Sequence, residues 1–151
     1  MVKLSSTDAN AVVDSNAVDS NADVRKRLKI WYDSPYRFVT QALGVEPEEW
    51  QKKAMLAIKN NDRVAVKSGH GVGKSALESW IILWWLLTRY PAKVACTAPT
   101  GHQLSDVLWG EIAKWYRKLP PGLKSLLAVK NDRVELVSAP SESFAVARTA
   151  R

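Results

Sequence analysis

One stretch of the chain combines glycines, a lysine and a serine at a spacing suited to holding phosphate groups. It ends in Gly73-Lys74-Ser75, the last three positions of the phosphate-loop pattern, whose first position here is Ser68 instead of Gly. The glycines let the backbone turn its N–H groups inward around phosphate oxygens. The Lys74 ammonium suits the β and γ phosphates, and the Ser75 hydroxyl suits Mg²⁺. We therefore expect nucleotide contacts from Ser68, Gly69, His70, Gly71, Val72, Gly73, Lys74 and Ser75.

Such a loop needs a strand before it and a helix after it. The alternation in Arg63–Lys67 predicts a short strand, and the apolar run from about Gly73 to Arg89 predicts a helix that Pro91 halts. The helix N-terminus would add its positive dipole end to the phosphate site. We expect the tryptophans of this helix, Trp80, Trp84 and Trp85, to pack in the core rather than to stack on bases. His70 at the loop tip is within reach of a γ phosphate, although an exposed loop side chain is the commoner outcome.

The remaining patterns alternate between helices and strands. Helices are predicted from Pro35 to Leu43, from Pro47 to about Lys59 and over 102–119, and strands at Lys93–Thr97, Arg133–Val137 and Ser143–Ala147. The apolar face of helix 102–119 consists of Leu104, Leu108, Ile112, Trp115 and Leu119. This order predicts an α/β fold with a parallel sheet and flanking helices.

Length, charge and cysteine content limit the classes of protein. The 151 residues allow one ordinary domain, and the single Cys96 excludes a disulfide scaffold. Residues 1–24 are a low-complexity repeat, expected to be a disordered tail, with a short capped helix as the less common alternative, and residues 25–151 form the domain. The tail holds one Lys and four Asp, so its net charge is −3. Since the whole chain has a net charge of +7, residues 25–151 carry +10. A basic body suits a nucleic acid partner.

Two further features bear on partners and location. Arg25, Lys26, Arg27 and Lys29 form a basic cluster that would grip phosphates or, more commonly, make one face of an exposed helix. The longest apolar run, residues 80–87, is far shorter than the ~20 residues of a membrane span. We expect an intracellular protein with no membrane partner.

Three segments together resemble the phage terminase large subunit, the ATPase that packages viral DNA. They are Glu49–Leu56 with its Gln51, the loop Ser68–Ser75, and Thr97-Ala98-Pro99-Thr100-Gly101-His102-Gln103. The resemblance covers residues 36–151 and implies a P-loop NTPase fold of the RecA/helicase-like type. It implies that Gln51 reads adenine with Trp50 beside it, although Gln51 from the sequence alone is equally an exposed helix residue. Thr97, Thr100 and Gln103 would couple the nucleotide state to DNA.

The resemblance also implies cofactors and partners. ATP and Mg²⁺ would bind at the loop, and double-stranded DNA, a terminase small subunit and a portal would be partners, with homo-oligomers also expected. The location would be the cytoplasm of a bacterial host, for a phage- or prophage-encoded protein.

One departure from the family concerns catalysis. Residues 1–151 contain no apolar strand that ends in Asp-Glu, the pair that orients Mg²⁺ and polarises the attacking water. We therefore expect the front portion of the ATPase domain, incomplete at its C-terminal side, with ATP binding but little or no turnover. The alternatives are a superfamily 2 helicase-like ATPase fragment and a non-catalytic nucleic-acid-binding remnant. A GTPase is disfavoured, since no Asn-Lys-x-Asp motif is present.

Overall fold

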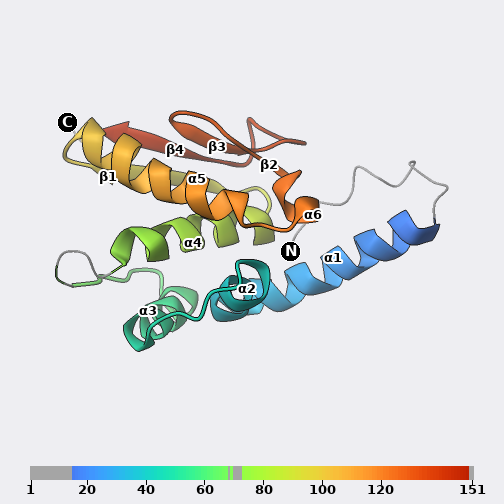
Figure 1. Cartoon of the computed structure of the whole chain (residues 1–151). Helices are drawn as coiled ribbons and strands as arrows, with labels where there is room; N and C mark the ends of the chain where they lie inside the picture. The colour runs from blue at the N-terminus through green and yellow to red at the C-terminus, as the bar shows by residue number, and fades with distance from the viewer. Residues whose placement is uncertain (1–14, 68, 70–72, 150–151) are drawn as a thin grey trace.

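The structure is a computed structural model that describes residues 15–67, 69 and 73–149 (Figure 1). It is a mixed α/β arrangement of helices beside one four-stranded sheet. The helical segments are α1 (Ser15–Asp33), α2 (Pro35–Ala42), α3 (Glu49–Asn60), α4 (Lys74–Thr88), the π-helical η2 (Gln103–Leu108), α5 (Trp109–Arg117) and α6 (Pro121–Lys124). The strands are β1 (Lys93–Ala98), β2 (Leu127–Val129), β3 (Arg133–Leu136) and β4 (Phe144–Thr149).

The sheet is mixed, so the prediction of a parallel sheet is only partly right. The strand order is β1-β4-β3-β2. β1 and β4 are parallel, with Lys93 opposite Phe144, whereas β3 pairs antiparallel with both β4 and β2. The antiparallel pairs follow from short connections, because a turn between neighbouring strands can only reverse the chain. β1 is an edge strand of this sheet.

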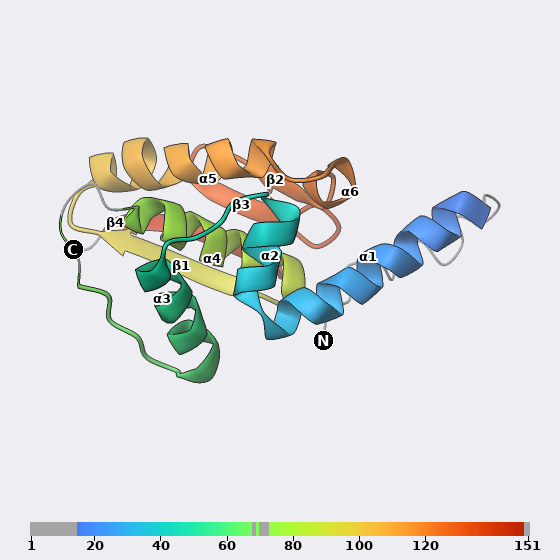
Figure 2. The same cartoon turned by 60° about the horizontal axis from the view of Figure 1, so that its bottom comes forward.

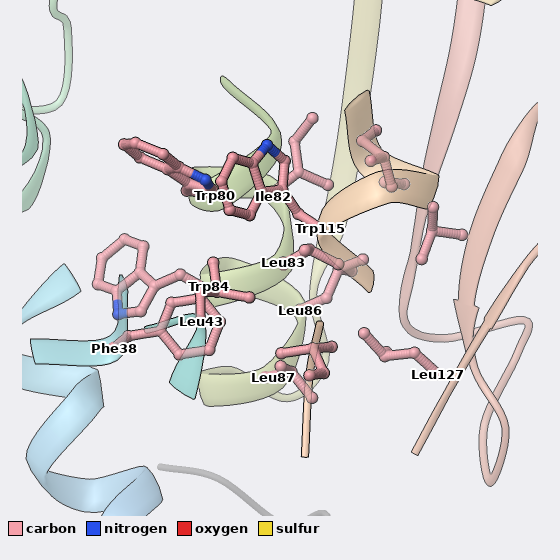
Figure 3. Close-up of a cluster of buried hydrophobic side chains, with 14 of the residues drawn as sticks. Phe38, Leu43, Trp80, Ile82, Leu83, Trp84, Leu86, Leu87, Trp115 and Leu127 are labelled. Atoms are coloured by element: carbon pink, nitrogen blue, oxygen red, sulfur yellow. The ribbon is translucent and has the colours of Figure 1, made fainter. Parts of the chain in front are cut away.

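Helix α4 forms the centre of the hydrophobic core (Figure 3). Its sequence is apolar nearly all round, which is typical of a helix covered on several sides. Trp84 is fully buried and donates its indole N–H to the Trp31 carbonyl of α1 at 2.5 Å. Trp80 lies edge-on to Trp115 of α5 with ring centroids 5.3 Å apart. The prediction that these tryptophans pack in the core is therefore confirmed for Trp80 and Trp84.

Local sequence signals define the ends of several helices. Ser34 accepts a hydrogen bond from the Arg37 N–H at 3.2 Å, which caps the start of α2. Gly44 follows α2 with φ 68°, the left-handed conformation that ends helices. Helix α4 ends at Thr88, before Pro91, as predicted. The predicted apolar face of helix 102–119 is also confirmed, because all five of its residues are buried.

The predicted strand Arg63–Lys67 is not a strand in the structure. The segment runs from the end of α3 toward the loop before α4 as irregular backbone, apart from the four-stranded sheet (Figure 2). Val64 and Val66 are each 39% exposed. A strand exists only when a neighbouring strand accepts its hydrogen bonds, and no described strand lies beside this segment.

The first residues of two helices also differ from what the sequence led us to expect. Residues 15–24, expected within a disordered tail, are the first part of α1; residues 1–14 lie outside the described residues. No proline or glycine interrupts 15–24, so a helix held in place by the buried Leu28 and Trp31 can extend through it. In α3 the helix begins at Glu49 rather than Pro47, since Glu48 has the extended backbone of a cap residue.

Candidate functional site

Of the phosphate-type loop, the structure describes Gly69, which is exposed, and the residues from Gly73 onward, which form the N-terminus of α4. Gly73 caps the helix with φ 84° and ψ 24°, a left-handed conformation that glycine adopts without steric cost. Its carbonyl accepts the Leu77 N–H at 3.1 Å, and Lys74 and Ser75 form the first turn. Ser68, His70, Gly71 and Val72 lie outside the described residues, so their predicted contacts remain predictions.

The side chain of Gln51 joins α3 to this helix start. Gln51 is only 5% exposed, which excludes the interpretation of an exposed helix residue. Its Nε2 donates to the Gly73 carbonyl at 3.2 Å, and its Oε1 accepts the Glu48 N–H at 2.9 Å. Both polar atoms of the Gln51 amide are therefore hydrogen-bonded: Nε2 at the start of α4 and Oε1 at the start of α3.

A side chain at Gly73 would force the Gln51 amide to shift. A Cβ at this position would lie 2.9 Å from the Gln51 Nε2 and 3.9 Å from Cζ2 of Trp50. The indole N–H of Trp50 donates to the Glu48 carboxylate at 2.7 Å, which fixes the ring next to the start of α4. Both the positive φ and the close approach favour glycine here.

A cavity of about 390 Å³ lies beside the same helix start. Lys74 of α4 and Thr97 of β1 both line it, so the loop segment and the third resembling segment meet in one cavity. The other lining residues are largely apolar: Ile58, Val64, Val66, Leu77, Glu78, Ile81, Ile82, Cys96 and Leu108. Thr100 and Gln103 are not among them.

Thr100 has a structural role at the start of the next helical segment. Its Oγ1 accepts the Gln103 N–H at 3.3 Å, a contact of the kind that caps helices. Both residues are exposed. Among the three residues predicted to couple nucleotide to DNA, only Thr97 thus lines the cavity that Lys74 also lines.

Sequence reasoning missed Glu78, the acidic residue of the cavity wall. It lies one helical turn after Lys74, at the i,i+4 spacing that places two side chains on one face. Desolvation raises the pKa of Glu78 above its usual value, and the positive charge of Lys74 opposes that shift. Burial and the Glu78 charge raise the pKa of the Cys96 thiol to about 11, so this cysteine is a neutral wall residue near pH 7. The i,i+4 spacing was the signal that would have identified Glu78.

Groups that hold metals or anchor in membranes are not found in the part of the chain that the structure describes. Residues 15–67, 69 and 73–149 contain no cluster of three or more His, Cys, Asp or Glu side chains able to hold a metal ion. No helix among them combines the length and the apolar character needed to cross a bilayer. The sequence motif singles out the Ser75 hydroxyl as a metal ligand, and Ser75 lies in the first turn of α4.

No protein-family model and no curated protein matches this chain.

Proposed function

We propose that this chain binds ATP with Mg²⁺ at the N-terminus of α4 and belongs to a phage terminase large subunit, the motor that packages double-stranded DNA. The observation that carries the proposal is the convergence of three segments far apart in the sequence. Gln51 donates a hydrogen bond to Gly73, and Lys74 and Thr97 line one cavity. These three segments are the ones that resemble the terminase ATPase. The P-loop NTPase fold belongs to the same proposal.

Each residue at this site has a defined part in holding the nucleotide. The N–H groups at the start of α4 and the helix dipole attract the phosphates, and the Lys74 ammonium meets the β and γ phosphate oxygens. Ser75 supplies a hydroxyl ligand to Mg²⁺, which when bound neutralises phosphate charge. Gln51 fixes the backbone of Gly73 through its Nε2. In this arrangement the Gln51 amide holds the loop backbone. Adenine would then contact the neighbouring Trp50, whose ring lies close to Gly73.

The DNA partner is proposed from charge. Residues 25–151 carry a formal +10, and Lys26, Arg27 and Lys29 are exposed on α1. Helix α1 projects beyond the rest of the fold (Figure 1). Exposed cations on a projecting helix are suited to the phosphate backbone of a duplex.

The direct test is to titrate a fluorescent ATP analogue with Mg²⁺ against the wild-type chain and the Lys74→Ala variant. Loss of a charge-assisted contact removes roughly 1.5–3 kcal/mol, so affinity should fall about tenfold or more. Lys53→Ala is the matched control, since Lys53 is an exposed lysine on α3 outside the cavity. Equal affinities for wild type and Lys74→Ala would refute nucleotide binding at this helix.

A further inference from the structure

A second cavity lies among the three N-terminal helices, away from α4. Its volume is about 500 Å³, within the range of pockets that bind ligands or anchor side chains. The end of α1, the start of α2 and one face of α3 form its walls, and these helices lie together in Figure 2. The lining residues are Ile30, Asp33, Ser34, Pro35, Tyr36, Arg37, Lys52, Met55, Leu56 and Lys59, here called the α1–α3 groove.

Apolar side chains are unusually exposed at the α1–α3 groove. Leu56 is 60% exposed, and Ile30 and Tyr36 are each 37% exposed. Among the described residues, these are three of the eight large hydrophobic side chains left exposed, and all three line one groove. Scattered single residues of this kind are ordinary, whereas a group beside a cavity is typical of a protein interaction site.

The charges at the groove are mostly positive. Lys52 is already neutralised by Glu46 at 2.7 Å and Glu49 at 3.1 Å. Arg37 and Lys59 are exposed, and neither side chain makes an ion pair with any described residue. The groove therefore combines exposed apolar side chains with two available cations, opposed by the single acid Asp33.

We propose that the α1–α3 groove binds an acidic amphipathic helix of a partner protein. Large apolar side chains at i, i+3 or i+4 and i+7 would fill the cavity between Ile30 and Leu56, as in other complexes in which a helix lies in a groove. Acidic side chains flanking them would pair with Arg37 and Lys59 at the rim. This inference does not rest on nucleotide binding at α4.

The structure favours a peptide over a nucleic acid at this groove. Non-specific binding of single strands relies on several aromatic faces for stacking, and the groove offers only Tyr36. The Tyr36 hydroxyl is bonded to Glu46 at 3.2 Å, and the Lys52 ammonium lies 5.6 Å from the centre of its ring. Four of the ten lining residues, by contrast, are aliphatic: Ile30, Pro35, Met55 and Leu56.

Fluorescence anisotropy with a defined probe tests the proposal. The probe is a labelled peptide of about three heptads with Leu at the core-facing positions and Glu at the others, a helix-in-groove pattern. Leu56→Glu should weaken its binding at least about tenfold, since it places a charge at the centre of the contact. Arg37→Gln with Lys59→Gln should weaken it about tenfold and flatten its salt dependence. Substitution at these exposed positions leaves the core intact, which circular dichroism would verify.

Matched controls separate the groove from general effects. Val137→Glu changes an apolar side chain that is 56% exposed and does not line the groove, and Lys53→Gln with Arg117→Gln removes two exposed cations outside the groove. Both should leave binding unchanged. Failure of the probe to bind above a peptide of the same composition in scrambled order would overturn the proposal. So would equal losses in the control variants, or a dT oligonucleotide that displaces the probe and itself depends on Leu56.

Discussion

The side-chain amide of Gln51 donates a hydrogen bond to the carbonyl of Gly73 at 3.2 Å, across 22 residues of sequence. Gly73 is the N-terminal cap of α4, so α3 is linked to the point where the phosphate-type loop enters its helix. Gln51 is only 5% exposed, so this hydrogen bond is largely shielded from water. Losing it would leave a buried polar group without a partner, which costs free energy. The position of Lys74 and Ser75 therefore depends on a residue of another helix.

Replacing Gly73 by Ala should destabilise the fold for two separable reasons. A left-handed conformation costs a non-glycine residue about 1–2 kcal/mol, and the new Cβ would also meet Gln51 Nε2 at 2.9 Å. Gly44→Ala is the matched control, since Gly44 has φ 68° with open space around it. Urea unfolding should show a larger loss for Gly73→Ala than for Gly44→Ala. Adding Gln51→Ala should recover part of the difference; equal losses in both glycine variants would mean that the close approach has no energetic effect.

The sequence predicted the elements whose signals are local. Helix α2 begins after the capping Ser34 and ends before Gly44, and α4 ends before Pro91. Each of these boundaries depends on the conformational preferences of one residue. Strand β1 was found because its alternating apolar pattern lies between clear breaks.

Elements defined by distant partners could not be predicted in this way. Arg63–Lys67 has a strand-like pattern but no neighbouring strand among the described residues, and β2 is a three-residue strand made only by pairing with β3. At the site, the sequence motifs singled out Gln51 and Gly73 separately. Their hydrogen bond follows from how α3 packs beside α4, which no local pattern encodes.

The stability of the fold should depend on pH through Glu135, which lies on β3, the strand paired with β2. Its carboxylate contacts the Lys130 ammonium at 2.6 Å and the Arg133 guanidinium at 2.9 Å, and the hydrogen bond from Lys130 is the main cause that lowers the pKa of Glu135. A group whose pKa is lower in the folded state stabilises the fold above its unfolded pKa, and that contribution is lost as pH falls through the folded value.

Urea unfolding at about pH 7 and about pH 3, on either side of the ordinary carboxyl range, measures this effect. The Glu135→Gln variant should be less stable than wild type at the higher pH and should lose less stability on acidification. Asp62→Asn is the control, because Asp62 is exposed and makes no ion pair with any described residue. If Glu135→Gln and wild type lose stability in parallel, the pair with Lys130 contributes nothing in solution.

Binding to duplex DNA should be weak and strongly dependent on salt. When lysines and arginines neutralise phosphates, the logarithm of the binding constant falls with the logarithm of salt concentration by about 0.9 per phosphate. Replacing Lys26 and Lys29 of α1 by Gln should reduce that slope by about two, while Lys53→Gln should not change it. A salt series that is flat for wild type, or no binding at low salt, would remove DNA from the proposed partners of this chain.

The chain of 151 residues should bind ATP with little or no hydrolysis. Lys74 and Ser75 can hold phosphates and Mg²⁺, but catalysis of phosphoryl transfer also needs an acid that positions and polarises the attacking water. Glu135 and Glu142 are the only acids after Asp132, and neither ends an apolar strand. Glu78 is the acid that lines the Lys74 cavity, but it lies on α4 behind the first turn, among apolar side chains.

A steady-state phosphate-release assay, with and without duplex DNA, measures turnover directly. Hydrolysis faster than ~1 s⁻¹, the low end for ordinary enzymes, would contradict the prediction if Lys74→Ala abolished it. In that event Glu78→Gln would identify whether the cavity acid supplies the missing group, because it removes the negative charge of Glu78 and keeps its shape.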